Sequence, residues 1–179
     1  MHKLLLPLLI VIVLFAASRF TVQAAAQSLP TVGQVAPTFT LLSQDNTPIS
    51  LASYRGKWVV LYFYPKDMTS GCTIEAHNFQ RDLAQFDAAG AVILGVSLDS
   101  PDSHRQFCTK ESLTFRLLAD PQHMVVDAYG SLGGFMGVKI ANRNTFLIDP
   151  QGKIAQVWTK VSVQHHSEEV LAAIAALKK

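Results

Sequence analysis

The chain has 179 residues, of which 49% are hydrophobic and 16% charged, and its formal net charge is +2. Without Lys3 and Arg19, which lie in the N-terminal segment described next, the remainder has 13 basic and 13 acidic side chains and is neutral. A neutral chain has no electrostatic reason to bind nucleic acid or a membrane surface, so both function classes are excluded from our expectations. We expect its partners to be small molecules and other proteins.

Residues 1–26 have the pattern of a signal peptide. Lys3 gives a basic start, an apolar run follows from Leu4 to Ala17, and Ala24–Ala26 offers a small-residue cleavage site. The apolar run is shorter than the roughly 20 residues that span a bilayer, and a proline and an arginine disturb it. An uncleaved membrane anchor is the alternative. We expect cleavage, a mature domain of residues 27–179, no stable membrane insertion, and export to the periplasm or an equivalent compartment.

The mature part predicts strands and helices that alternate. The continuous apolar run at 58–64 is typical of a strand buried on both faces. Phe79, Leu83 and Phe86 repeat with the spacing of one apolar helix face. In chain order we expect a hairpin (39–42 and 49–51), a strand (58–64), a helix from near residue 72 to 90, a strand (91–97), a helix (101–111), a short strand (115–118), a short helix (124–129), a Gly-rich loop (130–137), two strands (145–148 and 154–159) and a helix (168–177).

Two local signals support the boundaries of these elements. Ser100 is a suitable N-cap for the helix that has Pro101 at its first position. The sequence Asp-Pro-Gln-Gly at 149–152 is a strong turn between the last two strands. A βαβ unit, a helix, a hairpin and a closing helix imply a mainly parallel sheet with an antiparallel edge. This order predicts an α/β, thioredoxin-like fold with an N-terminal hairpin elaboration.

The chain has two cysteines, Cys72 and Cys108, and in an exported protein an even count first suggests a structural disulfide. Cys72, however, follows the buried strand at the start of a helix, where free N–H groups and the helix dipole favour the nucleophilic thiolate. Thr69 stands close enough for its hydroxyl to reach the sulfur or an oxygen bound to it, and Pro65 fixes the start of the loop. An inert, buried thiol would leave this spacing unexplained.

The segment Tyr62–Ala76 resembles the active-site segment of the peroxiredoxins, most closely the branch called peroxiredoxin Q or bacterioferritin comigratory protein. The resemblance continues at 89–97, 99–104 and 143–149 and covers nearly the whole mature chain. It implies a thiol-dependent peroxidase that reduces hydrogen peroxide and organic hydroperoxides through a sulfenic acid at Cys72. It implies no metal and no organic cofactor.

The resemblance also assigns roles to individual residues. Cys72 matches the peroxidatic cysteine, and Thr69 and Pro65 match the threonine and proline of the same motif. Arg143 matches an arginine whose guanidinium stabilises the thiolate and holds the peroxide oxygens. Glu75 matches a family glutamate that orders local polar contacts; the alternative is that it only complements the helix dipole.

The second cysteine departs from the commonest pattern of this branch. Many members have a resolving cysteine five residues after the peroxidatic one, where this chain has His77. Cys108 matches a second subgroup with the resolving cysteine on the following helix, so the resemblance implies a Cys72–Cys108 disulfide that a thioredoxin-like or glutaredoxin-like protein reduces. The alternative is a one-cysteine enzyme that an external thiol reduces directly. By analogy with the branch, we expect a monomer.

Two interpretations from other classes have to be compared with this one. An exported thiol–disulfide carrier normally has Cys-x-x-Cys, and here the third residue after Cys72 is Glu75. A non-enzymatic domain with a structural Cys72–Cys108 disulfide leaves Arg143 without a role. The pair His165-His166 lacks a third ligand for a metal and is expected on a surface loop.

Overall fold

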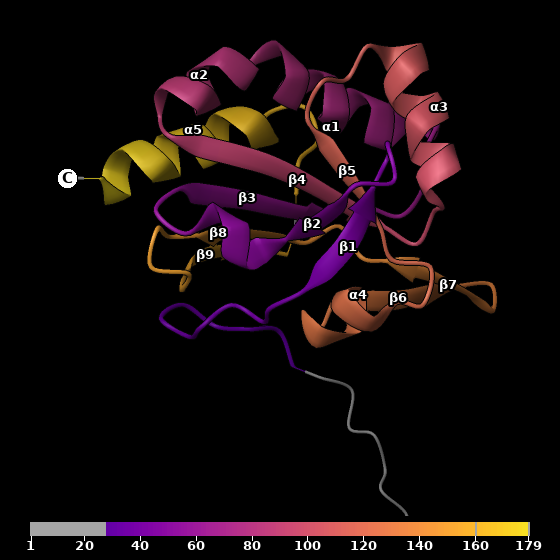
Figure 1. The fold of residues 1–179 in the computed structure, drawn as a ribbon, viewed down its shortest axis with the longest axis horizontal. Coiled ribbons are helices and arrows are strands. Elements are labelled where there is room, and N and C mark those ends of the chain that lie inside the picture. Colours follow the sequence, from indigo (N-terminus) through magenta and orange to yellow (C-terminus); the bar gives the residue numbers. More distant parts are fainter. Residues whose placement is uncertain (1–27, 160, 179) are drawn as a thin grey trace, which may run out of the picture.

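The computed structural model describes residues 28–159 and 161–178, so the predicted signal peptide lies outside the described residues. Within this part of the chain, seven strands form one sheet in the order β2-β1-β5-β4-β3-β8-β9, and β6 pairs with β7 in a separate hairpin (Figure 1). The strands are β1 (Thr40–Ser43), β2 (Pro48–Ser50), β3 (Trp58–Phe63), β4 (Ala91–Ser97), β5 (Arg116–Ala119), β6 (Leu132–Phe135), β7 (Val138–Ala141), β8 (Thr145–Ile148) and β9 (Ile154–Trp158). The helices are η1 (Leu51–Tyr54), α1 (Ser70–Arg81), α2 (Leu83–Ala88), α3 (Pro101–Glu111), α4 (Met124–Ala128) and α5 (His166–Leu177).

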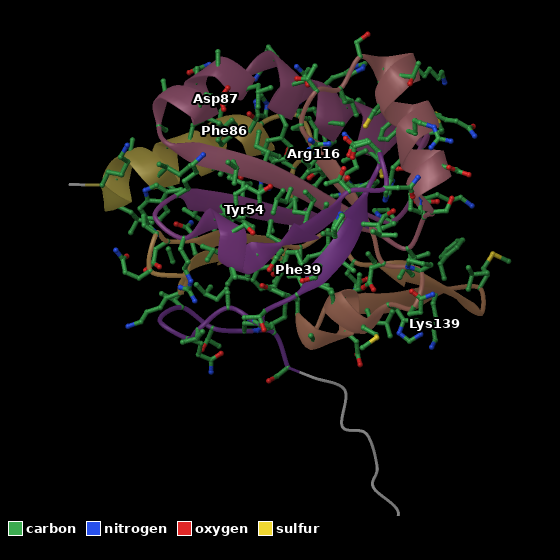
Figure 2. All side chains as sticks on the ribbon, in the orientation of Figure 1. Phe39, Tyr54, Phe86, Asp87, Arg116 and Lys139 are labelled. Atoms are coloured by element: carbon green, nitrogen blue, oxygen red, sulfur yellow. The ribbon has the colours of Figure 1, made fainter. Side chains whose placement is uncertain are left out.

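Strand β3 lies near the middle of the sheet and divides the core into two layers. It pairs in parallel with β4 and antiparallel with β8, and all of its residues are buried. Its side chains alternate between the faces. Tyr62 belongs to a core cluster that includes residues of α1, α2, α3 and α5, whereas Phe63 belongs to a second cluster that includes residues of η1 and α4. Phe86 on α2 and Phe39 before β1 accordingly lie on opposite sides of the sheet (Figure 2).

The expected fold class is confirmed. Strands β3, β4 and β5 are parallel, and β8 and β9 add the predicted antiparallel edge. The N-terminal hairpin of β1 and β2 extends the opposite edge through antiparallel pairing of β1 with β5. The start of α3 also follows the prediction, since the Ser100 hydroxyl caps this helix by accepting from the Ser103 amide.

Two expected elements were wrong in detail. The helix predicted from near residue 72 to 90 is divided into α1 and α2 at Asp82, whose backbone (φ −95°, ψ 3°) leaves the regular helix. Its carboxylate accepts hydrogen bonds from Arg81, Gln85 and Ser167, and these contacts stabilise the break. The Gly-rich loop predicted at 130–137 contains β6 and leads through a tight turn into β7.

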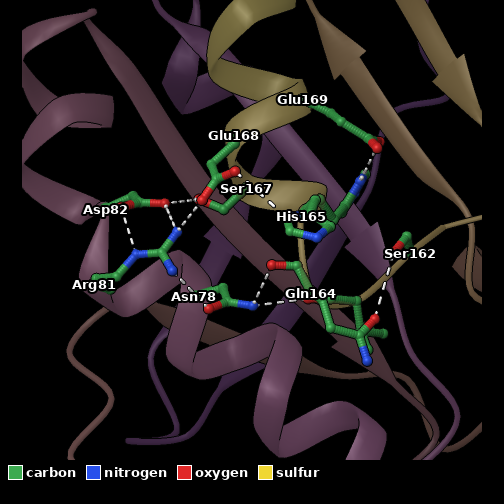
Figure 3. Close-up of polar contacts among 11 residues, drawn as sticks. Asn78, Arg81, Asp82, Ser162, Gln164, His165, Ser167, Glu168 and Glu169 are labelled. Atoms are coloured by element: carbon green, nitrogen blue, oxygen red, sulfur yellow. Dashed lines mark hydrogen bonds and ion pairs between the residues drawn. The ribbon is translucent and has the colours of Figure 1, made fainter.

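The C-terminal helix α5 is attached to α1 by several side chains (Figure 3). The Asn78 amide donates to the carbonyls of Val163 and Gln164 at 2.8 and 3.1 Å, and the Ser167 hydroxyl donates to Asp82 at 2.7 Å. His166 begins α5 and is fully buried, which corrects the expectation of a surface loop for this residue. Burial is also the main reason why the pKa of His166 falls to about 4.

The position of the Tyr62 ring on the sheet requires a glycine in β4. A Cβ atom on Gly95 would lie 2.7 Å from the ring of Tyr62 and from the side chain of Leu117. With no side chain there, the Tyr62 ring lies across β4 and stacks on Tyr64, with centroids 5.5 Å apart.

Among residues 28–159 and 161–178, no helix is both long enough and apolar enough to cross a bilayer.

Candidate active site

Cys72 lies in the first turn of α1, at the carboxyl end of β3, as predicted. The helix begins at Ser70, and its N-cap Thr69 has an extended backbone (φ −83°, ψ 149°). The first amides of a helix have no partner within it, and Cys72 belongs to this turn. The Cys72 side chain is buried and is a free thiol. The geometry therefore places a nucleophilic atom at the positive end of a helix dipole.

Arg143, in the segment between β7 and β8, contacts Cys72 directly. Its Nη2 donates to the Cys72 sulfur at 3.4 Å, and its Nη1 pairs with Oε2 of Glu75 one helical turn later. Burial acts to lower the pKa of Arg143, but the charges of Glu75 and of a Cys72 thiolate outweigh this effect, so the pKa is raised. Arg143 therefore stays a cation beside the sulfur, in the position that the resemblance implied.

Glu75 is the most deeply buried acidic group of the site, with a side chain only 1% exposed. Burial raises its pKa from 4.5 to about 7, although Arg143 acts in the opposite direction. Its second carboxylate oxygen, Oε1, is buried and has no hydrogen-bond partner among the described residues. Glu75 therefore orients the guanidinium of Arg143, which goes beyond complementing the helix dipole.

The loop from Pro65 to Thr69 begins half-buried and ends exposed. The Thr69 hydroxyl donates to the carbonyl of Lys66 at 2.9 Å, which closes this loop on itself. Its proton is therefore directed at the backbone and not at the sulfur, whereas its oxygen is still able to accept a hydrogen bond from an oxygen bound to the sulfur. Met68 has a positive φ of 62°, so the chain turns sharply just before α1.

Cys108 lies on α3 and is 8% exposed. Both cysteines are free thiols, and both belong to the hydrophobic cluster between the sheet and the helices α1, α2, α3 and α5. Burial is the main cause that raises the pKa of Cys108 to about 12. In this form of the molecule Cys108 is a protonated thiol on the same side of the sheet as Cys72.

Sequence reasoning missed a group of buried polar residues beside the site. Asp67, in the loop before Cys72, accepts hydrogen bonds from Tyr64, Ser103 and His104. We had singled out no role for His104. A signal was present, because His104, Phe107 and Cys108 have the i, i+3, i+4 spacing of one helix face, and that face is buried.

The fold and this site define a thioredoxin-like thiol enzyme, and the comparisons with known proteins agree. The model of the AhpC/TSA family matches residues 32–157. Peroxiredoxin Bcp of Bacillus subtilis is 41% identical over 150 residues, which cover 80% of this chain and 94% of that protein. A solved mutant of PrxQ from Xylella fastidiosa is 35% identical with a TM-score of 0.81, covering 86% of this chain and all of that one.

A third relative has been studied with ligands bound. The structure of Xanthomonas campestris bacterioferritin comigratory protein, solved to give insight into its alkyl peroxide reduction activity, is 38% identical with a TM-score of 0.77 and covers 83% of this chain and all of that one. The chain therefore belongs to the AhpC/TSA family and resembles its Bcp and PrxQ members. It is a peroxiredoxin, a thiol-dependent peroxidase that reduces hydroperoxides.

Proposed function

We propose that Cys72 is the residue that attacks the hydroperoxide. The observation that carries this assignment is the Arg143 guanidinium, which donates to the Cys72 sulfur and pairs with buried Glu75. The thiolate attacks one oxygen of the O–O bond, and the other oxygen leaves as an alcohol or water after taking up a proton, so that Cys72 becomes a sulfenic acid. Arg143 favours the thiolate and stabilises the negative charge that develops on the leaving oxygen.

Thr69 and Pro65 have supporting roles in this proposal. The Thr69 hydroxyl oxygen still has lone pairs when its proton is bonded to Lys66, so it can accept a hydrogen bond from the bound hydroperoxide. Pro65 fixes the start of the loop, which shields one side of the sulfur. No step requires a metal or an organic cofactor.

Cys108 acts as the resolving residue. Its thiol condenses with the Cys72 sulfenic acid, which forms a disulfide and releases one water molecule. The location of both thiols in one core cluster supports this pairing. Because a buried thiol of pKa about 12 is a poor nucleophile, the condensation requires α3 and the start of α1 to open. A thioredoxin-like or glutaredoxin-like dithiol protein then reduces the exposed disulfide of a monomeric enzyme.

The substrate class in this proposal is hydrogen peroxide together with organic hydroperoxides, in line with the alkyl peroxide reduction named for the Xanthomonas campestris relative. The enzyme acts outside the cytoplasm. The support for this location is the pattern of a basic start, a short apolar run and three alanines within residues 1–26.

Two serine variants test the assignment of the cysteines. Cys72→Ser should abolish peroxide consumption, because the nucleophile is lost. Cys108→Ser should consume one equivalent of peroxide and then stall with a thioredoxin-like reductant, because the sulfenic acid has no partner. If Cys108→Ser turns over at the parent rate, the one-cysteine mechanism is correct instead.

A further inference from the structure

A buried carboxylate joins the loop before Cys72 to the helix that carries Cys108. The Asp67 side chain accepts from the Tyr64 hydroxyl at 2.7 Å through one oxygen. Its other oxygen lies 2.7 Å from the Ser103 hydroxyl and 2.9 Å from Nδ1 of His104, both on α3. Asp67 is 4% exposed and His104 is fully buried.

The backbone of the same residue makes a second connection. The Asp67 amide donates to the carboxylate of Asp99 at 3.0 Å, and this carboxylate also accepts from the Ser97 hydroxyl at 2.7 Å. Ser97 ends β4 and Asp99 stands just before α3. The loop is thus attached both to α3 and to the segment that leads into it, although the reaction at Cys72 uses none of these groups.

These bonds keep Asp67 ionised in spite of its burial. Burial acts to raise the pKa of Asp67, but the hydrogen bonds and charge of His104, together with Tyr64 and Ser103, outweigh it and the pKa is lowered. The polar contacts of the His104 ring are all made through Nδ1, which also lies 3.2 Å from the Tyr64 hydroxyl, because Nε2 is buried without a hydrogen-bond partner within the described part of the chain. A buried network of this kind is costly to break in part, so its members separate together.

We propose that Asp67 is a positioning residue that latches the active-site loop to α3 through Ser103 and His104, and that release of this latch limits the rate of Cys72–Cys108 disulfide formation. We call these three residues the Asp67 latch. The inference rests on the proposed function of Cys108 as the resolving residue. His104 precedes Cys108 by one helical turn, so the latch holds the part of α3 that has to move.

Two reactions of the Cys72 sulfenic acid compete, and the latch affects their relative rates. In one, the Cys108 thiol displaces water from the sulfenic sulfur and the disulfide forms. In the other, a second hydroperoxide oxidises the sulfenic acid to sulfinic acid, and the hydroperoxide is reduced to an alcohol or water. Burial and the charge of Asp67 both raise the pKa of Cys108. Release of the latch exposes the Cys108 thiol and moves it away from Asp67, so its pKa falls and the thiol becomes more reactive.

The experiment compares Ser103→Ala with Thr109→Ala as a matched control. Both remove one hydroxyl from α3, but the exposed Thr109 side chain makes no hydrogen bond within the described residues. Loss of one hydrogen bond to a charged group should accelerate disulfide formation by about tenfold in Ser103→Ala and leave Thr109→Ala unchanged. The rate is followed by acid quench, alkylation and mass spectrometry after one equivalent of hydrogen peroxide.

Over-oxidation supplies a readout that a general loss of stability does not predict. The peroxide concentration that converts half of Cys72 to sulfinic acid should rise by about tenfold in Ser103→Ala, because the sulfenic acid survives for a shorter time. A second pair of variants checks the direction of the effect. His104→Leu should accelerate disulfide formation, whereas His104→Asn, whose amide nitrogen lies near the position of Nδ1 and donates to Asp67, should restore a rate close to that of the parent.

The possible outcomes separate this inference from the proposed function. If the disulfide forms in the parent but Ser103→Ala and Thr109→Ala form it at the same rate, the latch is overturned and the role of Cys108 stands. If His104→Asn is as fast as His104→Leu, the contact with Asp67 is not the determinant and the latch is again overturned. If Cys108 stays a free thiol in a parent enzyme that turns over, the proposed function itself fails.

Discussion

Arg143 provides the positive charge beside the sulfur that reacts. It holds a positive charge 3.4 Å from the sulfur, where negative charge is present before and during the reaction. We expect Arg143→Ala to slow the reaction of hydrogen peroxide with reduced Cys72 by about a hundredfold or more, the usual cost of removing one such donor. Stopped-flow kinetics of the first turnover measure this rate. Arg105→Ala, which removes an exposed arginine of α3, is the control, and a parent rate in Arg143→Ala would show that the anion site is elsewhere.

The unusual titration of Glu75 has a consequence for stability. With a pKa of about 7 in the folded protein against an ordinary 4.5, the folded form holds a proton that the unfolded chain has released between these values. The stabilisation that this proton gives is complete below pH 4.5, the ordinary pKa of the unfolded chain, and is lost as the pH rises through about 7, the pKa in the folded protein. Glu75→Gln cannot ionise, so it should gain stability relative to the parent between about pH 5 and about pH 8.

Urea unfolding of the reduced proteins at several pH values tests this difference. Asp87→Asn, which removes an exposed carboxylate from α2, is the control. The sign of the slope is the prediction, because the amide of Glu75→Gln also makes a different hydrogen bond with Arg143, and this change adds an offset that does not depend on pH. A difference between Glu75→Gln and the parent that stays constant with pH would contradict the assignment.

The residues found from the sequence and those missed differ in a physical way. Cys72, Thr69 and Pro65 belong to one short segment with a fixed spacing, so they were recognisable without the fold. The contact of Arg143 with the sulfur was expected only from the resemblance, and the structure brings the two together across 71 positions of the chain. Asp67 and His104 are 37 positions apart, and nothing local to either marks their contact.

At the level of elements, the two halves of α1 are held differently. The half that begins at Ser70 contains Cys72 and is tied to Arg143 through Glu75, whereas the half that ends at Arg81 is attached to α5 and the segment before it (Figure 3). We therefore expect disulfide formation to unwind only the part of α1 before Asn78. Hydrogen exchange with mass spectrometry should show that oxidation removes protection from the first turns of α1 and from α3, and preserves it after Asn78.

The hydrogen bonds of Asn78 to the segment before α5 can be removed to test this expectation. Asn78→Ala loses two hydrogen bonds to backbone carbonyls, so it should lower the free energy of unfolding by about 1–2 kcal/mol and let the loss of protection spread to the end of α1 on oxidation. Equal loss of protection along the whole of α1 in the oxidised parent would mean that the attachment to α5 does not limit the opening.

The elements predicted well are those with strong local signals. The Ser100 cap and Pro101 located the start of α3, and the continuous apolar run located β3. The division of α1 from α2 was not predictable, because the apolar spacing of Phe79, Leu83 and Phe86 continues across it. The cause is tertiary: Ser167 lies 85 positions away and binds the Asp82 carboxylate at the break.

At the scale of the whole molecule, the order of the elements was sufficient to predict the fold class, because alternating strands and helices require a parallel sheet with crossover helices.

Export is predicted from residues 1–26 and needs its own experiment. When the full-length gene product is expressed in a bacterium and the cells are fractionated, we expect a protein that begins at or near Gln27 outside the cytoplasm. Intact-mass measurement identifies the start, and a cytoplasmic protein that retains residues 1–26 would contradict the proposal.

The central claim is that Cys72 and Cys108, separate and reduced in the closed fold, become joined during turnover. Non-reducing peptide mapping of the protein after one equivalent of hydrogen peroxide tests it most directly. We expect a single cross-linked peptide that contains both cysteines within one chain and disappears on treatment with a thioredoxin-like reductant. A free Cys108 thiol in protein that continues to consume peroxide would contradict it.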